Sequence, residues 1–281
     1  MLALAKEELD RYGETNDRPV VRVAGVVGQT AQAVSEAGIA AELGYDAVLL
    51  SLTALRDANN EALIQHCRAV AEVMPVFGFY LQAVIGGPDL DVDFWRAFAK
   101  IENVVAIKTA PFDRYKTLDV VRGVVESGRA SEIALYTGND DNIVVDLLSE
   151  YRIEHEGDFV TKRITGGLLG HWAVWAKRAV ELMDDIKSGA YDSNTTEALA
   201  LANKVTDSNA VFFDAANNFA GCIVGLHEVL RRQGLLEGLW TLNEKEVLTP
   251  QQNAEIDRVY QAYPELNDDS FVEENLDRWL S

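Results

Sequence analysis

The residue in this sequence with the clearest chemical potential is Lys108, which directly follows the apolar run "VVAI". A strand this apolar is normally buried on both faces. Because burying an ammonium group without a partner is costly, a buried lysine tends to lose its proton and becomes a nucleophile that forms Schiff bases. The alternative is a lysine at a strand end whose ammonium group extends into solvent.

The elements that must position this lysine are visible as an alternation of two patterns. Short runs of apolar and β-branched residues predict six strands, at residues 20–26, 46–50, 76–80, 104–109, 132–136 and 159–165. Helical spacing of apolar residues predicts helices between them, at residues 31–43, 60–73, 94–101, 118–127 and 142–150. Strands that alternate with helices indicate a parallel sheet with right-handed crossovers.

The alternation stops after residue 165. From there the spacing predicts only helices, at residues 171–189, 193–205, 208–234 and 250–262. The chain is therefore expected to be an α/β protein with a helical extension at its C-terminal end.

Composition and charge exclude several classes of protein. The formal net charge of −20 over 281 residues disfavours binding to nucleic acid or to anionic membranes. No apolar run approaches the length of about 18 residues that indicates a membrane span, and the acidic, helix-patterned N-terminus does not resemble a signal peptide. Cys67 and Cys222 are far apart in apolar helical contexts, which favours a reduced, cytoplasmic setting. The four histidines show no metal-ligand spacing, so no metal site is predicted.

Three motifs in order resemble one enzyme family. The stretches "PVFGFYLQAVIGGPDL", "NVVAIKTA" and "LYTGNDD" are similar to the dihydrodipicolinate synthase and N-acetylneuraminate lyase family, the class I aldolases that handle pyruvate. The resemblance implies a covalent Schiff base on Lys108 with no other cofactor. It also implies that Tyr80, which keeps the family's spacing to this lysine, acts as the proton shuttle. A phenol beside the amine could move the protons that iminium formation requires.

The resemblance covers residues 20–262 and implies an α/β fold of the (β/α)8 TIM-barrel type. Family members begin with two more strands, so the six strands seen here suggest a barrel without its first two βα units. The expected domains are residues 1–170, a barrel portion that begins at the helix before the third barrel strand, and residues 171–281, a helical region that packs on the barrel.

Two departures from the family bear on the substrate. The arginine with which the synthase holds its second substrate falls on Ile85, which argues against dihydrodipicolinate synthesis itself. The family's hydroxyl-bearing turn after the second barrel strand has no counterpart here. Residues at strand ends remain candidates for binding the substrate, namely Gln82, Thr109, Thr137, Asn139, Lys162 and Thr165.

The leading hypothesis is a lyase or aldolase that acts on a 2-oxo acid of the pyruvate type through Lys108. A 2-keto-3-deoxy sugar acid dehydratase of the same family is an alternative. A second alternative is a catalytically impaired barrel retained as a binding or assembly subunit. The resemblance further implies a homo-oligomer, commonly a tetramer, with a small-molecule 2-oxo acid as its partner. Another lysine aldolase fold, such as deoxyribose-phosphate aldolase, lacks the paired tyrosine and is less favoured.

Overall fold

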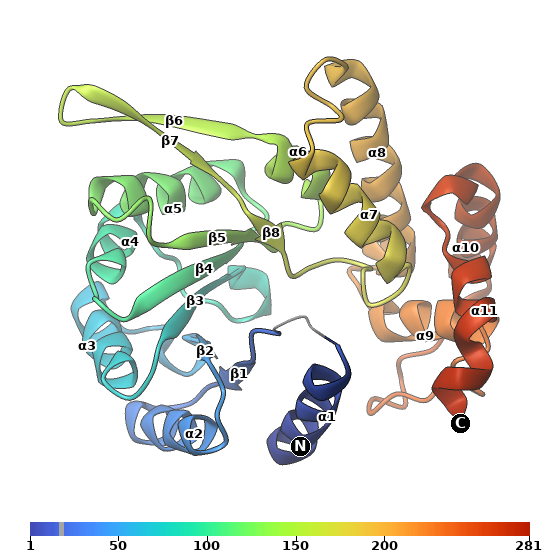
Figure 1. Cartoon of the computed structure of the whole chain (residues 1–281), viewed down its shortest axis with the longest axis horizontal. Coiled ribbons are helices and arrows are strands. Elements are labelled where there is room, and N and C mark those ends of the chain that lie inside the picture. Colours follow the sequence, from blue (N-terminus) through green and yellow to red (C-terminus); the bar gives the residue numbers. More distant parts are fainter. Residues whose placement is uncertain (17–19) are drawn as a thin grey trace. The chain divides into compact units, whose positions relative to one another are not determined.

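The computed structural model describes residues 1–16 and 20–281, which divide into two compact units (Figure 1). The first comprises residues 1–138 and 149–167, and the second comprises residues 139–148 and 168–281. The boundary expected after residue 170 differs from this division chiefly in helix α6 (Ile143–Leu148), which belongs to the second unit. In the described part of the chain, no helix is both long and apolar enough to cross a membrane.

The first unit is built on a sheet of six parallel strands in the order β1-β2-β3-β4-β5-β8. This confirms the predicted parallel α/β fold with six strands. The strands are β1 (Val23–Val26), β2 (Ala47–Leu50), β3 (Val76–Leu81), β4 (Val104–Ala110), β5 (Ala134–Thr137) and β8 (Gly166–Gly167). One helix follows each of the first four strands along the chain, namely α2 (Thr30–Glu42), α3 (Asn60–Ala71), α4 (Val92–Ala99) and α5 (Arg114–Glu126). A further helix, α1 (Leu2–Thr15), precedes β1, and the Tyr45 hydroxyl donates to the Leu2 carbonyl at 3.0 Å.

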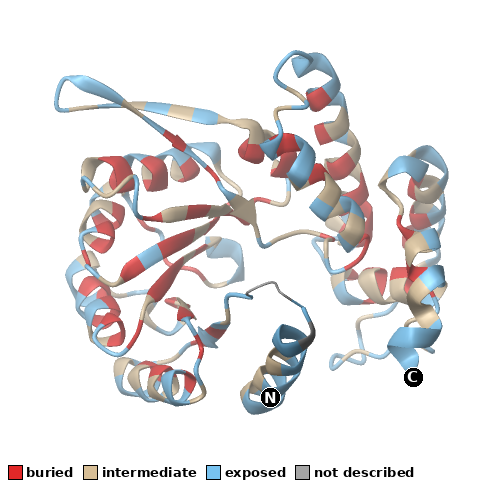
Figure 2. Cartoon of the chain, in the orientation of Figure 1, coloured by how far each residue is buried: buried red, intermediate tan, exposed pale blue. Residues whose placement is uncertain are grey.

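The aromatic residues of α4 define which side of the sheet is covered. Asp91 caps this helix by accepting from the Phe94 N–H at 2.8 Å, and Phe94, Trp95 and Phe98 are all buried. A Cβ atom on Gly78 would meet the Phe98 ring at 2.6 Å, so helix and strand approach closely only because glycine stands there. Figure 2 shows the resulting band of buried residues along the strands and the inward sides of the helices.

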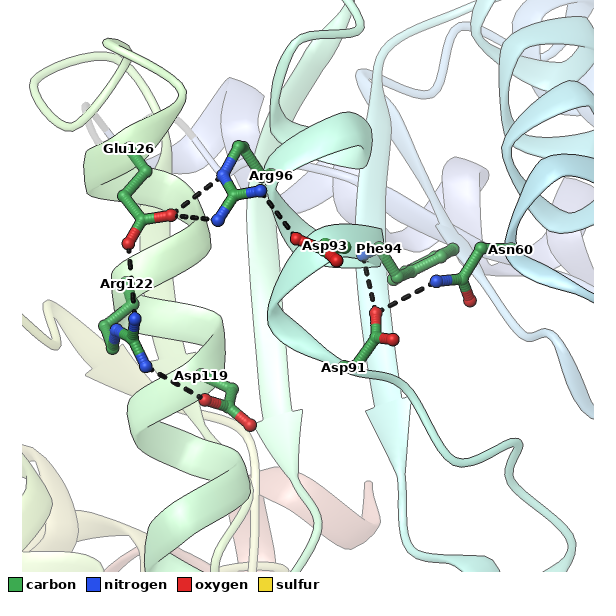
Figure 3. Close-up of polar contacts among 8 residues, drawn as sticks. All are labelled: Asn60, Asp91, Asp93, Phe94, Arg96, Asp119, Arg122 and Glu126. Atoms are coloured by element: carbon green, nitrogen blue, oxygen red, sulfur yellow. Dashed lines mark hydrogen bonds and ion pairs between the residues drawn. The ribbon is translucent and has the colours of Figure 1, made fainter.

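Ion pairs on the outer surface connect α4 with α5 (Figure 3). Arg96 donates to Asp93 at 2.6 Å and through Nε to Glu126 at 2.8 Å, and Arg122 lies 3.5 Å from the same glutamate. Asp91 also accepts from Asn60 at 2.9 Å, which links α4 to the start of α3. These contacts connect α3, α4 and α5, and each exposed ion pair among them is expected to contribute only about 0–1 kcal/mol.

A β-bulge at Val105 decides which side chains of β3 and β4 share a face. Val76 pairs with Val104, but the next residue, Phe77, pairs with Ala106, so Val105 is left without a partner on β3. Because side chains alternate along a strand, a shift of one residue changes which side chains of the two strands point to the same side. Beyond the bulge, Lys108 therefore pairs with Phe79.

The sixth predicted strand needs correction. Residues 159–165 do not enter the large sheet, because β7 (Asp158–Arg163) pairs antiparallel with β6 (Glu150–His155) in a separate hairpin. The hairpin turn places Glu156 and Gly157 at φ of 54° and 91°, the left-handed pair typical of a type I′ turn. The strand that pairs with β5 is the short β8.

The second unit is helical. Its aromatic and aliphatic core comprises Val174, Trp175, Val211, Phe212, Val229, Ile256 and Val259. Its helices are α6, α7 (Ala176–Lys187), α8 (Thr195–Phe212), α9 (Cys222–Arg232), α10 (Pro250–Ala262) and α11 (Asp269–Leu280). The predicted break between residues 205 and 208 is wrong, because α8 runs through it and the Ser208 hydroxyl donates back to the Lys204 carbonyl at 2.8 Å. The chain turns instead around Asp214, at φ of 53°.

Stability of this unit is expected to fall on mild acidification because of His171. Its ring is buried edge-on against Trp175 and Phe212, with centroid distances of 6.0 and 5.4 Å, and burial lowers the pKa of His171 to about 4. An unfolded histidine titrates near pH 6.5, so the unfolded state binds the extra proton between about pH 6.5 and 4. The contribution of this histidine is complete above pH 6.5, and about 3 kcal/mol is lost as the pH falls through that window.

Denaturant unfolding of the wild type and His171→Phe at intervals of pH checks this prediction. The variant keeps an aromatic ring but cannot titrate, so its free energy of unfolding should fall less steeply between about pH 6.5 and 4. Carboxyl groups titrate in both proteins and cancel in the difference. Parallel pH curves for the two proteins would contradict the assignment.

Candidate active site

Lys108 lies near the carboxyl end of β4, where catalytic residues gather in parallel α/β folds. Its side chain is half-buried, and its Nζ lies 4.9 Å from the centroid of the Phe79 ring on β3. A Cβ atom on Gly138 would stand 2.8 Å from Lys108 Cε, so glycine leaves the space that the lysine chain occupies. The lysine is therefore positioned between an aromatic ring and a backbone without a side chain.

Side chains on the two sides of the sheet have different surroundings. The lysine face, as we name it, carries Phe77, Phe79, Lys108 and Tyr136, which follow from the register of β3, β4 and β5 and from the alternation along each strand. The opposite side, the helix face, carries Tyr80, Thr109 and Thr137. Phe79, Lys108 and Tyr136 are half-buried, so solvent reaches the lysine face.

The structure does not bring Tyr80 to Lys108. Tyr80 pairs with Thr109 on the helix face, and its ring packs against Trp95 with a centroid distance of 5.2 Å. Its hydroxyl donates to the Leu90 carbonyl at 3.0 Å and accepts from the Leu90 N–H at 3.3 Å. Burial raises the pKa of this phenol well above its usual range. The expected role as proton shuttle thus lacks the geometry it needs, because the Val105 bulge turns Tyr80 away.

Replacing Tyr80 by phenylalanine is expected to lower the free energy of unfolding by about 1–3 kcal/mol. The change leaves the N–H and C=O groups of buried Leu90 without the partner that both use. Chemical denaturation measures the loss, with Tyr115→Phe as the matched control, because Tyr115 is 85% exposed. Equal stability of the two variants would show that the hydroxyl of Tyr80 does not support Leu90.

The phenol that shares the face of the lysine is Tyr136, a residue that the sequence motifs did not single out. Lys108 and Tyr136 are paired in register between β4 and β5. The Tyr136 ring lies 5.2 Å from that of Phe77, also on the lysine face. The pairing of strand ends between β4 and β5 was the signal that could have identified it.

The three threonines among the predicted substrate-binding residues either lie on the helix face or donate a hydrogen bond to the backbone. Thr109 and Thr137 are buried on the helix face, at 1% and 0% exposure. The Thr165 hydroxyl donates to the Leu135 carbonyl at 3.2 Å, and its N–H donates to the same carbonyl at 2.8 Å. The structure does not bring these three side chains together at Lys108.

The other three candidates lie in separate places. Lys162 is on the hairpin, and its Nζ donates to the carbonyls of Ala130 and Ile133, both at 2.6 Å. Burial lowers the pKa of this lysine. Asn139 is buried in the second unit and donates to Asp146 at 3.0 Å. Gln82 is half-buried and directly follows β3, at the carboxyl end of the sheet where Lys108 also lies.

The side chains that could ligate a metal ion or act as thiol nucleophiles are dispersed or buried. Within residues 1–16 and 20–281, no set of three or more His, Cys, Asp or Glu side chains has an arrangement suited to a metal ion. Cys67 is buried and burial raises the pKa of its thiol to about 12, while Cys222 is half-buried with its pKa raised to about 11. Both thiols are therefore poor nucleophiles near neutral pH, and Lys108 is a better candidate than either.

Sequence comparison relates the α/β part of the chain to known enzymes. Residues 14–150 match the dihydrodipicolinate synthetase family. The 4-hydroxy-tetrahydrodipicolinate synthase of Acaryochloris marina is 34% identical over 122 residues, which cover 43% of this chain and 40% of that relative. A synthase of the same name from Marinobacter nauticus is 27% identical over 198 residues, 69% of this chain and 60% of the relative. The chain thus spans less than two thirds of these curated relatives.

Solved structures support the fold. The dihydrodipicolinate synthase of Oceanobacillus iheyensis superposes with a TM-score of 0.69 at 18% identity, covering 94% of this chain and 80% of that one. The synthase of Acinetobacter baumannii, solved in complex with pyruvate, gives a TM-score of 0.66 at 19% identity, with 93% and 81% covered. At this level of identity the similarity establishes the architecture of the chain and not its reaction.

Proposed function

We propose that this protein, whose residues 14–150 match the dihydrodipicolinate synthetase family, is a lyase or aldolase that forms a Schiff base between Lys108 and a 2-oxo acid. The observation that carries the proposal is the setting of Lys108 on β4. The amine is half-buried on a solvent-accessible sheet face, near the carboxyl end of a central parallel strand.

The chemistry follows from what lies around the amine. Attack of Nζ on a ketone carbon, followed by loss of water, gives an iminium that withdraws electrons from the neighbouring carbon. A carbon–carbon bond at that neighbouring carbon can then be broken or formed. The positive charge of the iminium stays close to Nζ, which lies 4.9 Å from the Phe79 ring centroid. The quadrupole of the ring attracts a positive charge there, whether it belongs to the ammonium or to the iminium.

The second substrate should be weakly charged. The short helix after β3, Ala83–Ile85, exposes Val84 and Ile85 at 91% and 60%, and offers no cation to a second carboxylate. We therefore favour an uncharged aldehyde, such as the one released when a 2-keto-3-deoxy acid is cleaved, over an acidic aldehyde such as aspartate semialdehyde. Gln82 is the residue we propose for binding the carboxylate of the 2-oxo acid.

Trapping with borohydride tests the proposed chemistry. The protein is incubated with pyruvate and then reduced, and intact mass spectrometry should show a gain equal to pyruvic acid less one oxygen atom. Lactate, which has a hydroxyl in place of the ketone, is the control and should give no gain. A folded protein that gains no mass with pyruvate or with larger 2-oxo acids would contradict the proposal.

One observation favours a second function, that of a binding or assembly subunit. Among the described residues, β1 and β8 each pair with a strand on one side only. Exposed strand edges are templates for pairing with another chain. A folded protein that shows no adduct but elutes at the mass of a stable assembly would favour this function.

A dehydratase would instead form the adduct and release water from a 2-keto-3-deoxy acid.

A further inference from the structure

The neighbour of Lys108 across the sheet on the β5 side is a tyrosine. Tyr136 stands on β5 directly opposite Lys108 in the parallel register. Paired residues of adjacent strands are about 4.8 Å apart and point to the same side. The two side chains therefore extend from neighbouring positions on one face.

Two glycines and one aromatic ring fix where these side chains lie. A Cβ atom on Gly166 would stand 2.8 Å from the Tyr136 ring, so the ring packs directly on the backbone of β8. The Phe77 ring also contacts it, with a centroid distance of 5.2 Å. Beside Lys108, Gly138 leaves space for the lysine chain. The Tyr136 side chain is thus held on the lysine face, where it is half-buried.

We propose that Tyr136, and not Tyr80, is the residue that transfers protons at Lys108. The inference rests on the proposed Schiff-base function and extends it by assigning its acid and base. Tyr80 has its hydroxyl bound to both backbone groups of Leu90 on the helix face. Tyr136 is the tyrosine that the register places beside the amine.

The protons balance in two steps. The neutral amine attacks the ketone carbon, the carbonyl π electrons move to oxygen, and one proton passes from nitrogen to that oxygen to give a carbinolamine. The Tyr136 hydroxyl donates the proton that the oxygen gains and takes up the proton that the nitrogen loses. A second proton, supplied by water through the same hydroxyl, then lets the oxygen leave as water while the nitrogen lone pair completes the iminium.

Tyr136→Phe and Tyr80→Phe are matched variants for the test. Each is mixed with pyruvate and quenched with borohydride at timed intervals, and exchange of the pyruvate methyl protons is followed by NMR in D₂O. Tyr136→Phe should slow adduct formation and exchange about 100-fold or more, while reaching the same final extent of adduct. Tyr80→Phe, although less stable, should retain the wild-type rates below its unfolding temperature.

Gly166→Ala provides an independent variant that keeps both hydroxyl groups. Its added methyl group must displace the Tyr136 ring, so the two rates should fall as they do for Tyr136→Phe. Circular dichroism and thermal melting confirm that each variant is folded before its rates are compared.

The outcomes separate the two proposals. A wild-type protein that forms no adduct overturns the Schiff-base function and this inference with it. A wild-type protein that forms the adduct, with Tyr136→Phe reacting at the wild-type rate, overturns the role of Tyr136 alone. Slow reaction of Tyr80→Phe, with a fast Tyr136→Phe, assigns the protons to Tyr80 and also overturns the inference.

Discussion

Lys108→Met is expected to abolish the borohydride-trapped adduct and to reduce exchange of the pyruvate methyl protons to the uncatalysed rate. Methionine is similar in length to lysine and can pack against Phe79, but it has no amine to attack a ketone. Because Lys108 is half-buried, the variant should fold. Lys108→Arg should be equally inactive, since a guanidinium stays protonated in proteins and cannot act as the nucleophile.

Lys100→Met is the matched control for this loss. Lys100 is exposed at the end of α4, so its removal should leave both the trapped mass and the exchange rate unchanged. Retention of the adduct by folded Lys108→Met would show that another amine carries the chemistry. Loss of the adduct in both variants would point to a general effect of removing a lysine.

Arg129→Met is expected to lower the free energy of unfolding by about 2–4 kcal/mol, although Arg129 is only partly buried. The Arg129 guanidinium donates to four backbone carbonyls, those of Ala99, Ile101, Glu102 and Val104, at 2.9, 2.6, 3.0 and 3.1 Å. These carbonyls belong to the end of α4, the turn after it and the first residue of β4. The arginine therefore holds the start of the strand that carries Lys108.

Urea unfolding of Arg129→Met and of Glu132→Gln measures this contribution. Glu132 accepts from the same guanidinium at 2.7 Å, but its side chain is 59% exposed, so removing its charge should cost less than about 1 kcal/mol. Equal losses in the two variants would show that the ion pair, and not the carbonyl contacts, carries the stabilisation.

Strands β1 to β5 were predictable because each is a short run rich in apolar and β-branched residues, whereas β8 is only the pair Gly166–Gly167. The bulge at Val105 was not predictable, since "NVVAIKTA" shows no glycine or break where the extra residue lies. That one residue separates Tyr80 from Lys108, and Tyr136 is the tyrosine left on the lysine face. The apolar run and the motif around it identified Lys108 as a candidate nucleophile, whereas the face on which each tyrosine lies depends on pairing between strands.

The hairpin and the helical unit show the same limit. The segment "EYRIEHEGDFVTKR" alternates along both arms of the hairpin, but a turn with Glu before Gly is a weak signal for the left-handed pair. The prediction therefore kept only its second arm and assigned it to the sheet. In α8, Thr206 to Ser208 resembled a helix break, yet packing of Val205, Val211 and Phe212 in the core continues the helix through it.

Peptide mapping of the reduced pyruvate adduct tests the central claim most directly. Trypsin cannot cleave after a lysine that carries the adduct, so the peptides IENVVAIK and TAPFDR should remain joined, and fragmentation should place the added mass on Lys108. That result would establish the Schiff base at the predicted residue of β4. Normal cleavage after Lys108, with the added mass on another lysine or on none, would contradict the account.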